Sequence, residues 1–179
     1  VDLGARSVSI ELGLGEAVTC TFKNVKEGQI IVDKVTDPSR TDVFSFTTTG
    51  EDAYSHEFTL TEFDAPYVQS VMPGTYAVTE TLAGDWALSD VTCFSSRNNN
   101  QMADNIVLGY GEVVTCVFTN TLKGTIIVDK VTEPCCADEL FEFDAGGGAY
   151  QDFTLTDRGQ PNKQTLMYGT YSITELVPS

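Results

Sequence analysis

Positive charge, histidine and long apolar runs are all scarce in this chain of 179 residues. Ten lysines and arginines stand against 26 aspartates and glutamates, so the formal net charge is −16. Nucleic acids and anionic lipid surfaces both attract cationic faces, and neither is therefore expected as a partner. No apolar run reaches the roughly 20 residues of a membrane-spanning helix, so membrane insertion is not expected either.

The chain also lacks the patterns that carry catalysis and metal binding. Its one histidine, His56, corresponds to Gln151 or Asp152 in the repeat described below, so the repeat does not preserve it. A Ser–His–Asp system would need this histidine at the centre of a pocket, and we interpret it as a surface residue. Neither an acidic calcium loop nor a Cys-x-x-Cys pair is present. We therefore assign no catalytic residue, no metal and no cofactor.

What the sequence does contain is an internal repeat. Residues 15–38 (GEAVTCTFKNVKEGQIIVDKVTDP) return almost unchanged at residues 111–134 (GEVVTCVFTNTLKGTIIVDKVTEP). The phrase Phe-Thr-Leu-Thr at Phe58 likewise returns at Phe153. Between such matches only the loop lengths drift, which is the behaviour of two copies of one fold.

Alternating β-branched and aromatic residues, separated by Gly, Pro, Asn and Asp, predict an all-β fold. Seven or eight short strands in one repeat are typical of an antiparallel β-sandwich. In the complete repeat the expected strands cover residues 29–36, 43–48, 56–61, 67–71, 75–82, 87–94, 105–109 and 112–120. In the second copy they cover residues 125–132, 140–144, 151–156, 164–167 and 170–176.

The boundaries of the repeat do not coincide with the two ends of the sequence. Residues 28–122 make one complete unit, whereas residues 123–179 contain no counterpart of residues 86–121. Residues 1–27 precede the complete unit, and within them residues 8–24 (VSIELGLGEAVTCTFKN) match the strands that the second unit lacks. An open sandwich exposes its apolar interior and an unpaired edge, which are liabilities in a monomer. We therefore expect the second sandwich to be completed by a donor strand of a neighbouring molecule.

The short links between units favour a neighbour over self-closure. Only three residues separate Asn24 from Gly28, and the same short link joins Asn120 to Gly124. Such a link reaches roughly 13–14 Å, much less than the length of a sandwich domain. A head-to-tail contact of this kind does not close on itself and propagates as a helical homopolymer, here by strand addition. The expected donor side chains are Val8, Ile10, Leu12, Val18, Cys20 and Phe22.

Other interpretations remain open at this point. Joining the end of the second unit to the N-terminal residues leaves out about 12 residues, equivalent to residues 86–97. Either the shared domain lacks one strand, or the chain is a segment of a long tandem-repeat stalk or adhesin. A ligand-binding module of an enzyme complex is a third class. Trp86 could belong to a carbohydrate platform, but its place at the start of a strand, directly after a turn, favours a core position.

Three phrases of the complete repeat return elsewhere in the chain, the first unchanged and the other two with a few substitutions. They are Gly-x-Ile-Ile-Val-Asp-Lys-Val-Thr, Pro-Gly-Thr-Tyr-x-Val-Thr-Glu-Thr and Val-Thr-Cys-x-Phe-Thr-Asn. They resemble SpaA and Cna-B type domains, which are tandem stalk modules of bacterial surface proteins and pilins. The resemblance implies two tandem Ig-like, prealbumin-like sandwich domains and an extracellular, cell-surface location without enzyme activity. No sortase-type Leu-Pro-x-Thr-Gly motif is present, which favours strand donation. Without an Asn-x-Ser/Thr sequon, O-glycans are the modification left open.

Many domains of that family form an internal isopeptide bond, in which a lysine attacks an asparagine amide with help from a carboxyl group. The resemblance places these roles on Lys34, Glu80 and Asn120. The strand phase agrees, because each follows apolar residues at a spacing of two and shares their face. Burial would favour a neutral amine and a protonated carboxyl. The alternative is that the lysines are solvated and the asparagines end strands. The matching set across two molecules is Lys130, Glu175 and Asn24.

The five cysteines predict one disulfide in the complete unit. Cys93 and Cys116 end the similar phrases Asp-Val-Thr-Cys and Val-Val-Thr-Cys in adjacent late strands. A bond between them fits an oxidising, extracellular setting. Cys20 is the equivalent of Cys116, and its natural partner falls in the missing segment. We expect Cys135 or Cys136 to pair with Cys20 across the junction, which leaves one cysteine odd.

Overall fold

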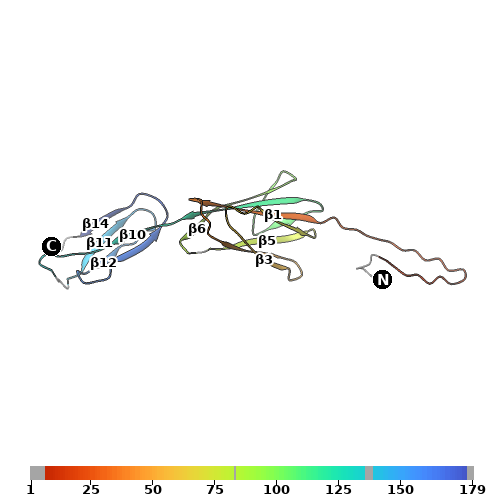
Figure 1. Cartoon of the computed structure of the whole chain (residues 1–179), viewed down its shortest axis with the longest axis horizontal. Coiled ribbons are helices and arrows are strands. Elements are labelled where there is room, and N and C mark those ends of the chain that lie inside the picture. The colour runs from red at the N-terminus through yellow and green to blue at the C-terminus, as the bar shows by residue number, and fades with distance from the viewer. Residues whose placement is uncertain (1–6, 83, 136–138, 177–179) are drawn as a thin grey trace.

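The structure is a computed structural model that describes residues 7–82, 84–135 and 139–176. These residues form β-strands and turns, without any helix in the described ranges. Figure 1 shows three parts in a row: an N-terminal segment (residues 7–27), a first sandwich (residues 28–122) and a second unit (residues 123–176). The described residues accordingly offer no helix that could span a membrane.

The first sandwich consists of two sheets with the strand orders β4-β1-β9-β6-β7 and β3-β2-β5-β8. Its strands are β1 (Gly28–Asp37), β2 (Phe44–Gly50), β3 (Ser55–Leu60), β4 (Tyr67–Val71), β5 (Gly74–Thr81), β6 (Trp86–Ser95), β7 (Asn100–Gln101), β8 (Ile106–Leu108) and β9 (Val113–Leu122). The expected antiparallel pairing holds except between β1 and β9, which run parallel. The chain crosses from one sheet to the other between β8 and β9, and β9 thereby enters beside β1 in the same direction.

The core lies between the two sheets. Along β1 buried and partly exposed residues alternate, as the two-residue period of a strand requires, and Ile30 and Val32 face inward. Trp86 opens β6 and packs edge to face on Phe44, with ring centroids 5.5 Å apart. Trp86 is therefore a core residue, as its position after a turn predicted.

The second unit repeats part of this arrangement. Its strands are β10 (Gly124–Val128), β11 (Phe141–Gly146), β12 (Phe153–Leu155), β13 (Asn162–Leu166) and β14 (Ser172–Leu176). The pair β10-β13 reproduces β1-β4, and the sheet β12-β11-β14 reproduces β3-β2-β5. Phe143 stacks on Phe153 at 5.0 Å as Phe46 stacks on Phe58 at 5.3 Å. The two copies of the repeat therefore share side-chain packing as well as sequence.

Both sheets of the second unit have an open edge. In the first sandwich β9 pairs with β1 and β8 pairs with β5. Among the described residues, nothing occupies the equivalent position beside β10 or beside β14. The interior is correspondingly exposed: Ile173 is 41% exposed, whereas its counterpart Val78 is 2% exposed.

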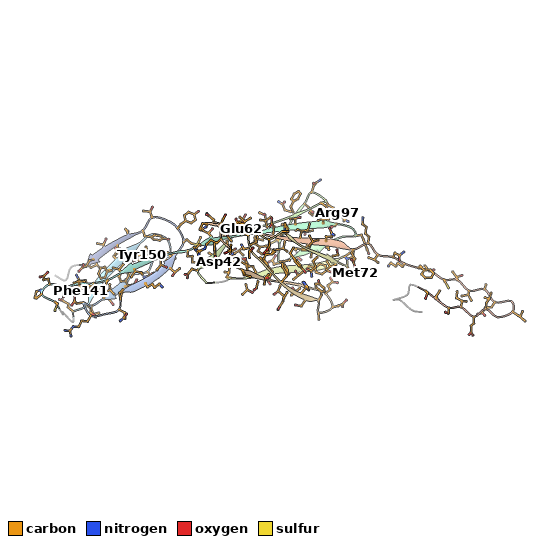
Figure 2. All side chains as sticks on the ribbon, in the orientation of Figure 1. Asp42, Glu62, Met72, Arg97, Phe141 and Tyr150 are labelled. Carbon is orange, nitrogen blue, oxygen red and sulfur yellow. A yellow bond between two sulfur atoms is a disulfide. The ribbon has the colours of Figure 1, made fainter. Side chains whose placement is uncertain are left out.

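The N-terminal segment forms no strand over residues 8–27, although its sequence is that of β8 and β9. A strand needs a pairing partner, and the single chain supplies none within the described residues. Figure 2 shows its side chains projecting from a segment that runs away from the first sandwich and then turns back on itself. The apolar residues among them, including Ile10, Leu12 and Phe22, are exposed.

Candidate functional site

The site with the most unusual chemistry lies inside the first sandwich, between its two sheets. Lys34 comes from β1 and Asn120 from the adjacent β9, whereas Glu80 comes from β5 in the opposite sheet. Each follows inward-facing apolar residues at a spacing of two, so the alternation of the strand turns it into the core. The structure thus brings the three predicted residues together.

The three side chains contact one another directly. Lys34 Nζ lies 3.5 Å from Glu80 Oε1, and both side chains are 0% exposed. Asn120 Nδ2 donates a hydrogen bond of 3.1 Å to the same Glu80 oxygen. Lys34 Nζ also donates to the backbone oxygens of Val35, at 2.9 Å, and Phe118, at 3.1 Å. The amine is thereby held beside the strand that carries Asn120.

Burial sets the protonation preferences of this site. Burial lowers the pKa of the Lys34 ammonium, and the nearby Glu80 carboxylate only partly opposes that shift. Burial likewise raises the pKa of Glu80, against the influence of Lys34 and Asn120. Both shifts favour the neutral amine and the neutral acid, which is the state that a nucleophilic lysine requires. Glu80 Oε2 and Asn120 Oδ1 are buried without a hydrogen-bond partner among the described residues.

The second unit contains the same pair in a more open form. Lys130 Nζ lies 3.0 Å from Glu175 Oε1, with side-chain exposures of 16% and 36%. Asn24 lies on the exposed N-terminal segment, so the predicted trio of Lys130, Glu175 and Asn24 is not assembled within the described part of one chain.

The sequence interpretation missed an aromatic ring at each site. Lys34 Nζ lies 4.3 Å from the centroid of the Phe44 ring, and Lys130 Nζ lies 4.2 Å from that of Phe141. A ring face attracts a cation and also shields it from water. The sequence feature that could have indicated this contact is a phenylalanine near the start of the same expected strand in both repeats.

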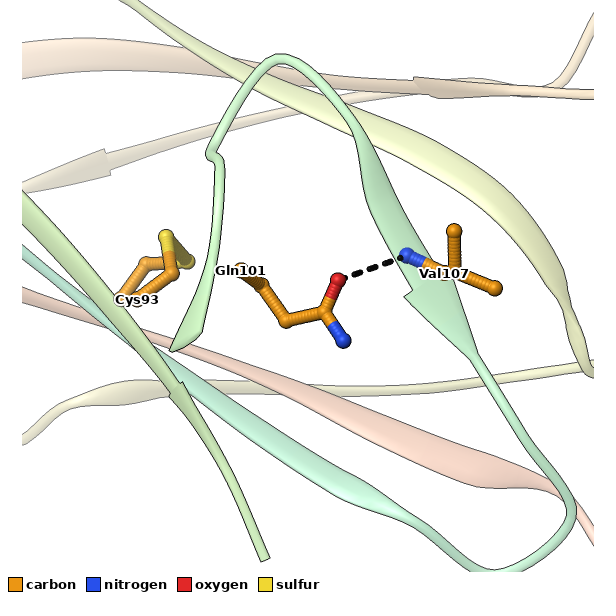
Figure 3. Close-up of a disulfide and its surroundings, with 4 residues drawn as sticks. Cys93, Gln101 and Val107 are labelled. Atoms are coloured by element: carbon orange, nitrogen blue, oxygen red, sulfur yellow. Dashed lines mark hydrogen bonds between the residues drawn. A yellow bond between two sulfur atoms is a disulfide. The ribbon is translucent and has the colours of Figure 1, made fainter. Parts of the chain in front are cut away.

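The cysteines fall into two groups. Cys93 on β6 and Cys116 on β9 lie opposite each other and form a disulfide, the pair that the sequence interpretation joined. Figure 3 shows this bond beside β7, where the Gln101 side chain accepts a hydrogen bond of 3.3 Å from the Val107 backbone N–H. The bond and this contact connect β6, β7, β8 and β9 across the two sheets.

The expected pairing of Cys20 is not present in the single chain. Cys20 is a free, exposed thiol. Cys135 already takes part in a disulfide, so in this state it is not available to Cys20. Cys136 lies outside the described residues. A bond from Cys20 to either residue of a neighbouring molecule stays a prediction.

The remaining candidates do not build a second site. His56 is exposed, and its Nε2 lies 2.6 Å from the Tyr67 hydroxyl oxygen at the edge of the sandwich. No group of three or more metal-ligating side chains gathers in the part of the chain that the structure describes.

Comparisons with known proteins place this geometry in context. Residues 30–122, slightly more than half of the chain, match the family SpaA_4, described as a prealbumin-like fold domain. The Bacillus anthracis TIE protein is 16% identical with a TM-score of 0.42, over 86% of this chain and 29% of that protein. A C-terminal fragment of the pilus adhesin SpaC from Lactobacillus rhamnosus GG is 16% identical with a TM-score of 0.35, over 84% of this chain and 75% of the fragment. The chain therefore spans less than a third of the TIE protein. No curated protein matches the sequence.

Proposed function

Because the chain belongs to the SpaA family of prealbumin-like fold domains, we propose that it is a structural subunit of an extracellular surface filament and not an enzyme. In this filament residues 1–27 of one molecule complete the second unit (residues 123–179) of the next. Identical molecules then join head to tail through β-strand complementation. The first sandwich is closed by its own strands and acts as a spacer between shared domains.

One observation carries this proposal: the N-terminal segment exposes a stripe of apolar side chains that matches the strand positions left open in the second unit. The inward side chains of β8 and β9, from Ile106 to Phe118, are buried in the first sandwich. Their counterparts in the N-terminal segment are exposed: Ile10, Leu12, Val18, Cys20 and Phe22. Burying such side chains is worth about 1.5–3 kcal/mol each before the cost of association. This is enough to drive specific assembly.

The arrangement of the parts supports assembly between molecules. In Figure 1 the N-terminal segment and the second unit lie at opposite ends of the first sandwich. This placement favours a donor segment that completes the unit of another molecule over one that folds back onto its own chain. Because β1 and β9 run parallel, a donor that takes the place of β9 keeps the direction of the acceptor chain, and the next sandwich follows in line. Such a contact repeats without closing.

We further propose that the Lys34 site forms an isopeptide bond. Lys34 Nζ attacks the side-chain amide carbon of Asn120, the new C–N bond replaces the old one, and ammonia leaves with a proton taken from the lysine. Glu80, 3.5 Å from the amine and 3.1 Å from the amide, is placed to carry that proton. Each bond lowers the mass by about 17 Da. In the shared domain the same reaction would join Lys130 to Asn24 with help from Glu175.

The test is assembly of the purified chain, followed by boiling in SDS and reductant. Fibres that pellet and are seen by electron microscopy support the proposal, and Phe22→Asp serves as the assembly-deficient control. After boiling, multiples of 19.4 kDa indicate covalent junctions, and a single 19.4 kDa band indicates strand complementation alone. A chain that stays monomeric at every concentration contradicts the proposal.

A second candidate is a segment of a long single-chain stalk or adhesin. It is favoured by β6, which pairs with β9 over most of its length and has no counterpart in the proposed shared domain. In a stalk, the same polypeptide would supply that strand. The mass of the natural polypeptide distinguishes the two, because a stalk is many times larger than 19.4 kDa.

A further inference from the structure

We propose that the N-terminal segment is a two-strand clip that enters both sheets of one acceptor unit. Residues 10–12 would extend the sheet of β14, and residues 17–24 would pair in parallel with the strand that begins as β10. The proposal rests on the head-to-tail assembly proposed above. It adds which sheet each part of the donor segment enters, the register of the pairing and the turn that sets this register.

The first argument is a turn that already exists in the free segment. In the first sandwich the chain passes from β8 to β9 through a turn in which Glu112 N donates to Gly109 O at 3.2 Å, and Gly109 N donates to Glu112 Oε2 at 2.7 Å. In the N-terminal segment Glu16 N donates to Gly13 O at 3.3 Å, and Gly13 N donates to Glu16 Oε2 at 3.0 Å. The turn therefore forms without a sandwich around it.

The backbone of the two turns agrees as well. Gly111 has φ 64° and Gly15 has φ 76°, a region that glycine adopts at little cost and other residues rarely enter. In the first sandwich this turn carries the chain between sheets, so that β8 and β9 lie in different layers. A preformed turn lowers the ordering cost of binding and holds the two arms of the segment in position to reach two sheets.

The second argument comes from the acceptor, where two strands are shorter than their counterparts. β1 extends from Gly28 to Asp37, and its last five residues pair with β9 alone, because the pairing with β4 ends at Val32. β10 ends at Val128, the counterpart of Val32, where its pairing with β13 also ends. The missing extension is therefore the part that depends on a β9-like partner.

The opposite sheet shows the same loss. β5 begins at Gly74, and its first three residues pair with β8. The counterpart of Gly74 is Gly169, yet β14 begins only at Ser172. Two strands in two different sheets are thus shortened at the positions that β8 and β9 would support. A single inserted strand would restore one of them, whereas a clip restores both.

Because the two repeats align residue by residue, the strand pairing in the first sandwich predicts the pairing between the donor segment and the second unit. Tyr76 pairs with Ile106 and Thr75 with Val107, which places Ile10 opposite Tyr171 and Glu11 opposite Thr170. Ile31 pairs with Thr115, which places Thr19 opposite Ile127. A slip of one residue would turn Val18, Cys20 and Phe22 outward, so burial selects this register strongly.

Paired cysteine substitutions in the full chain, made in a Cys20→Ser background, test the clip. Thr19→Cys with Ile127→Cys probes the parallel arm, and Glu11→Cys with Thr170→Cys probes the other arm. The matched controls within one molecule are Ile31→Cys with Thr115→Cys and Thr75→Cys with Val107→Cys, whose pairing the structure shows. Thr21→Cys with Ile127→Cys is the off-register control. Fibre formation is checked by electron microscopy before a mild oxidant is added.

The clip predicts that both junction pairs cross-link molecules into ladders at yields similar to those of the matched controls, and that the off-register pair yields at least several-fold less. Fibres in which only the Thr19–Ile127 pair cross-links overturn the clip but leave strand complementation standing. Fibres in which the off-register pair reacts best overturn the register. Absence of both fibres and intermolecular ladders, while the matched controls react, overturns this inference together with the proposed function.

Discussion

Replacing Phe22 by alanine should weaken assembly without disturbing the single chain. Phe22 is 65% exposed in the free segment, whereas its counterpart Phe118 is 2% exposed and packs edge to face on Phe46 at 5.2 Å. If Phe22 takes the equivalent place in the acceptor, it loses roughly six-tenths of an exposed area of about 200 Å². At about 25 cal/mol per Å², the lost burial is worth about 3 kcal/mol.

This energy predicts roughly a hundredfold rise in the concentration at which fibres form, since about 1.4 kcal/mol changes an affinity tenfold. Sedimentation of a concentration series measures that threshold. Thr21→Ala is the matched control, because the counterpart of Thr21, Val117, lies on the opposite face of β9 from Phe118. Circular dichroism of both variants should be unchanged. An unchanged threshold for Phe22→Ala would refute the assignment of Phe22 to the acceptor core.

Four other outcomes follow. Asn120→Ala removes the amide that Lys34 attacks, so its intact mass should lack the loss of about 17 Da; a persisting loss would place the bond elsewhere. Replacing both Cys93 and Cys116 by serine should lower the free energy of unfolding of the first sandwich by about 2–4 kcal/mol in urea titrations, and reductant should then have no further effect on that sandwich. Ile173→Asp should abolish fibres yet leave the free chain folded, because Ile173 is half-exposed there and buried only after assembly; fibres of this variant would rule out the acceptor groove. Burial raises the pKa of Glu80. The protonated carboxyl therefore stabilises the fold fully at a pH below the ordinary glutamate pKa, and this stabilisation is lost as the pH rises through the raised pKa. Glu80→Gln in the Asn120→Ala background should flatten that loss in unfolding titrations.

Strand positions in the first sandwich could be predicted because each strand buries one face. The alternation of Ile30, Val32 and Lys34 indicates the strand and also the face, and the observed β1 differs from the expected strand by one residue at each end. The same argument predicted that Lys34, Glu80 and Asn120 point inward. Phe44 under Lys34 was not predicted, because its contact depends on how two strands pack across the core.

The alternation of residues does not predict which strands pair with each other. It also does not predict where a strand ends when that end depends on a neighbouring strand. The parallel pairing of β1 with β9 and the two-residue strand β7 arise from the path of the chain between sheets. The expected strands at residues 125–132 and 170–176 are longer than β10 and β14, because their extra residues have the right pattern but lack a neighbour to pair with. The N-terminal segment is the extreme case, because it has the pattern of two strands but pairs with no strand in the described part of its own chain.

The most direct measurement is a cryo-electron microscopy reconstruction of the assembly that the purified chain forms at neutral pH. The account predicts a fibre in which complete sandwiches alternate with shared ones, and in which residues 10–24 of one molecule lie between β10 and β14 of its neighbour. It is contradicted if these residues fill the second unit of their own molecule, if the molecules join through other surfaces, or if only single chains are found.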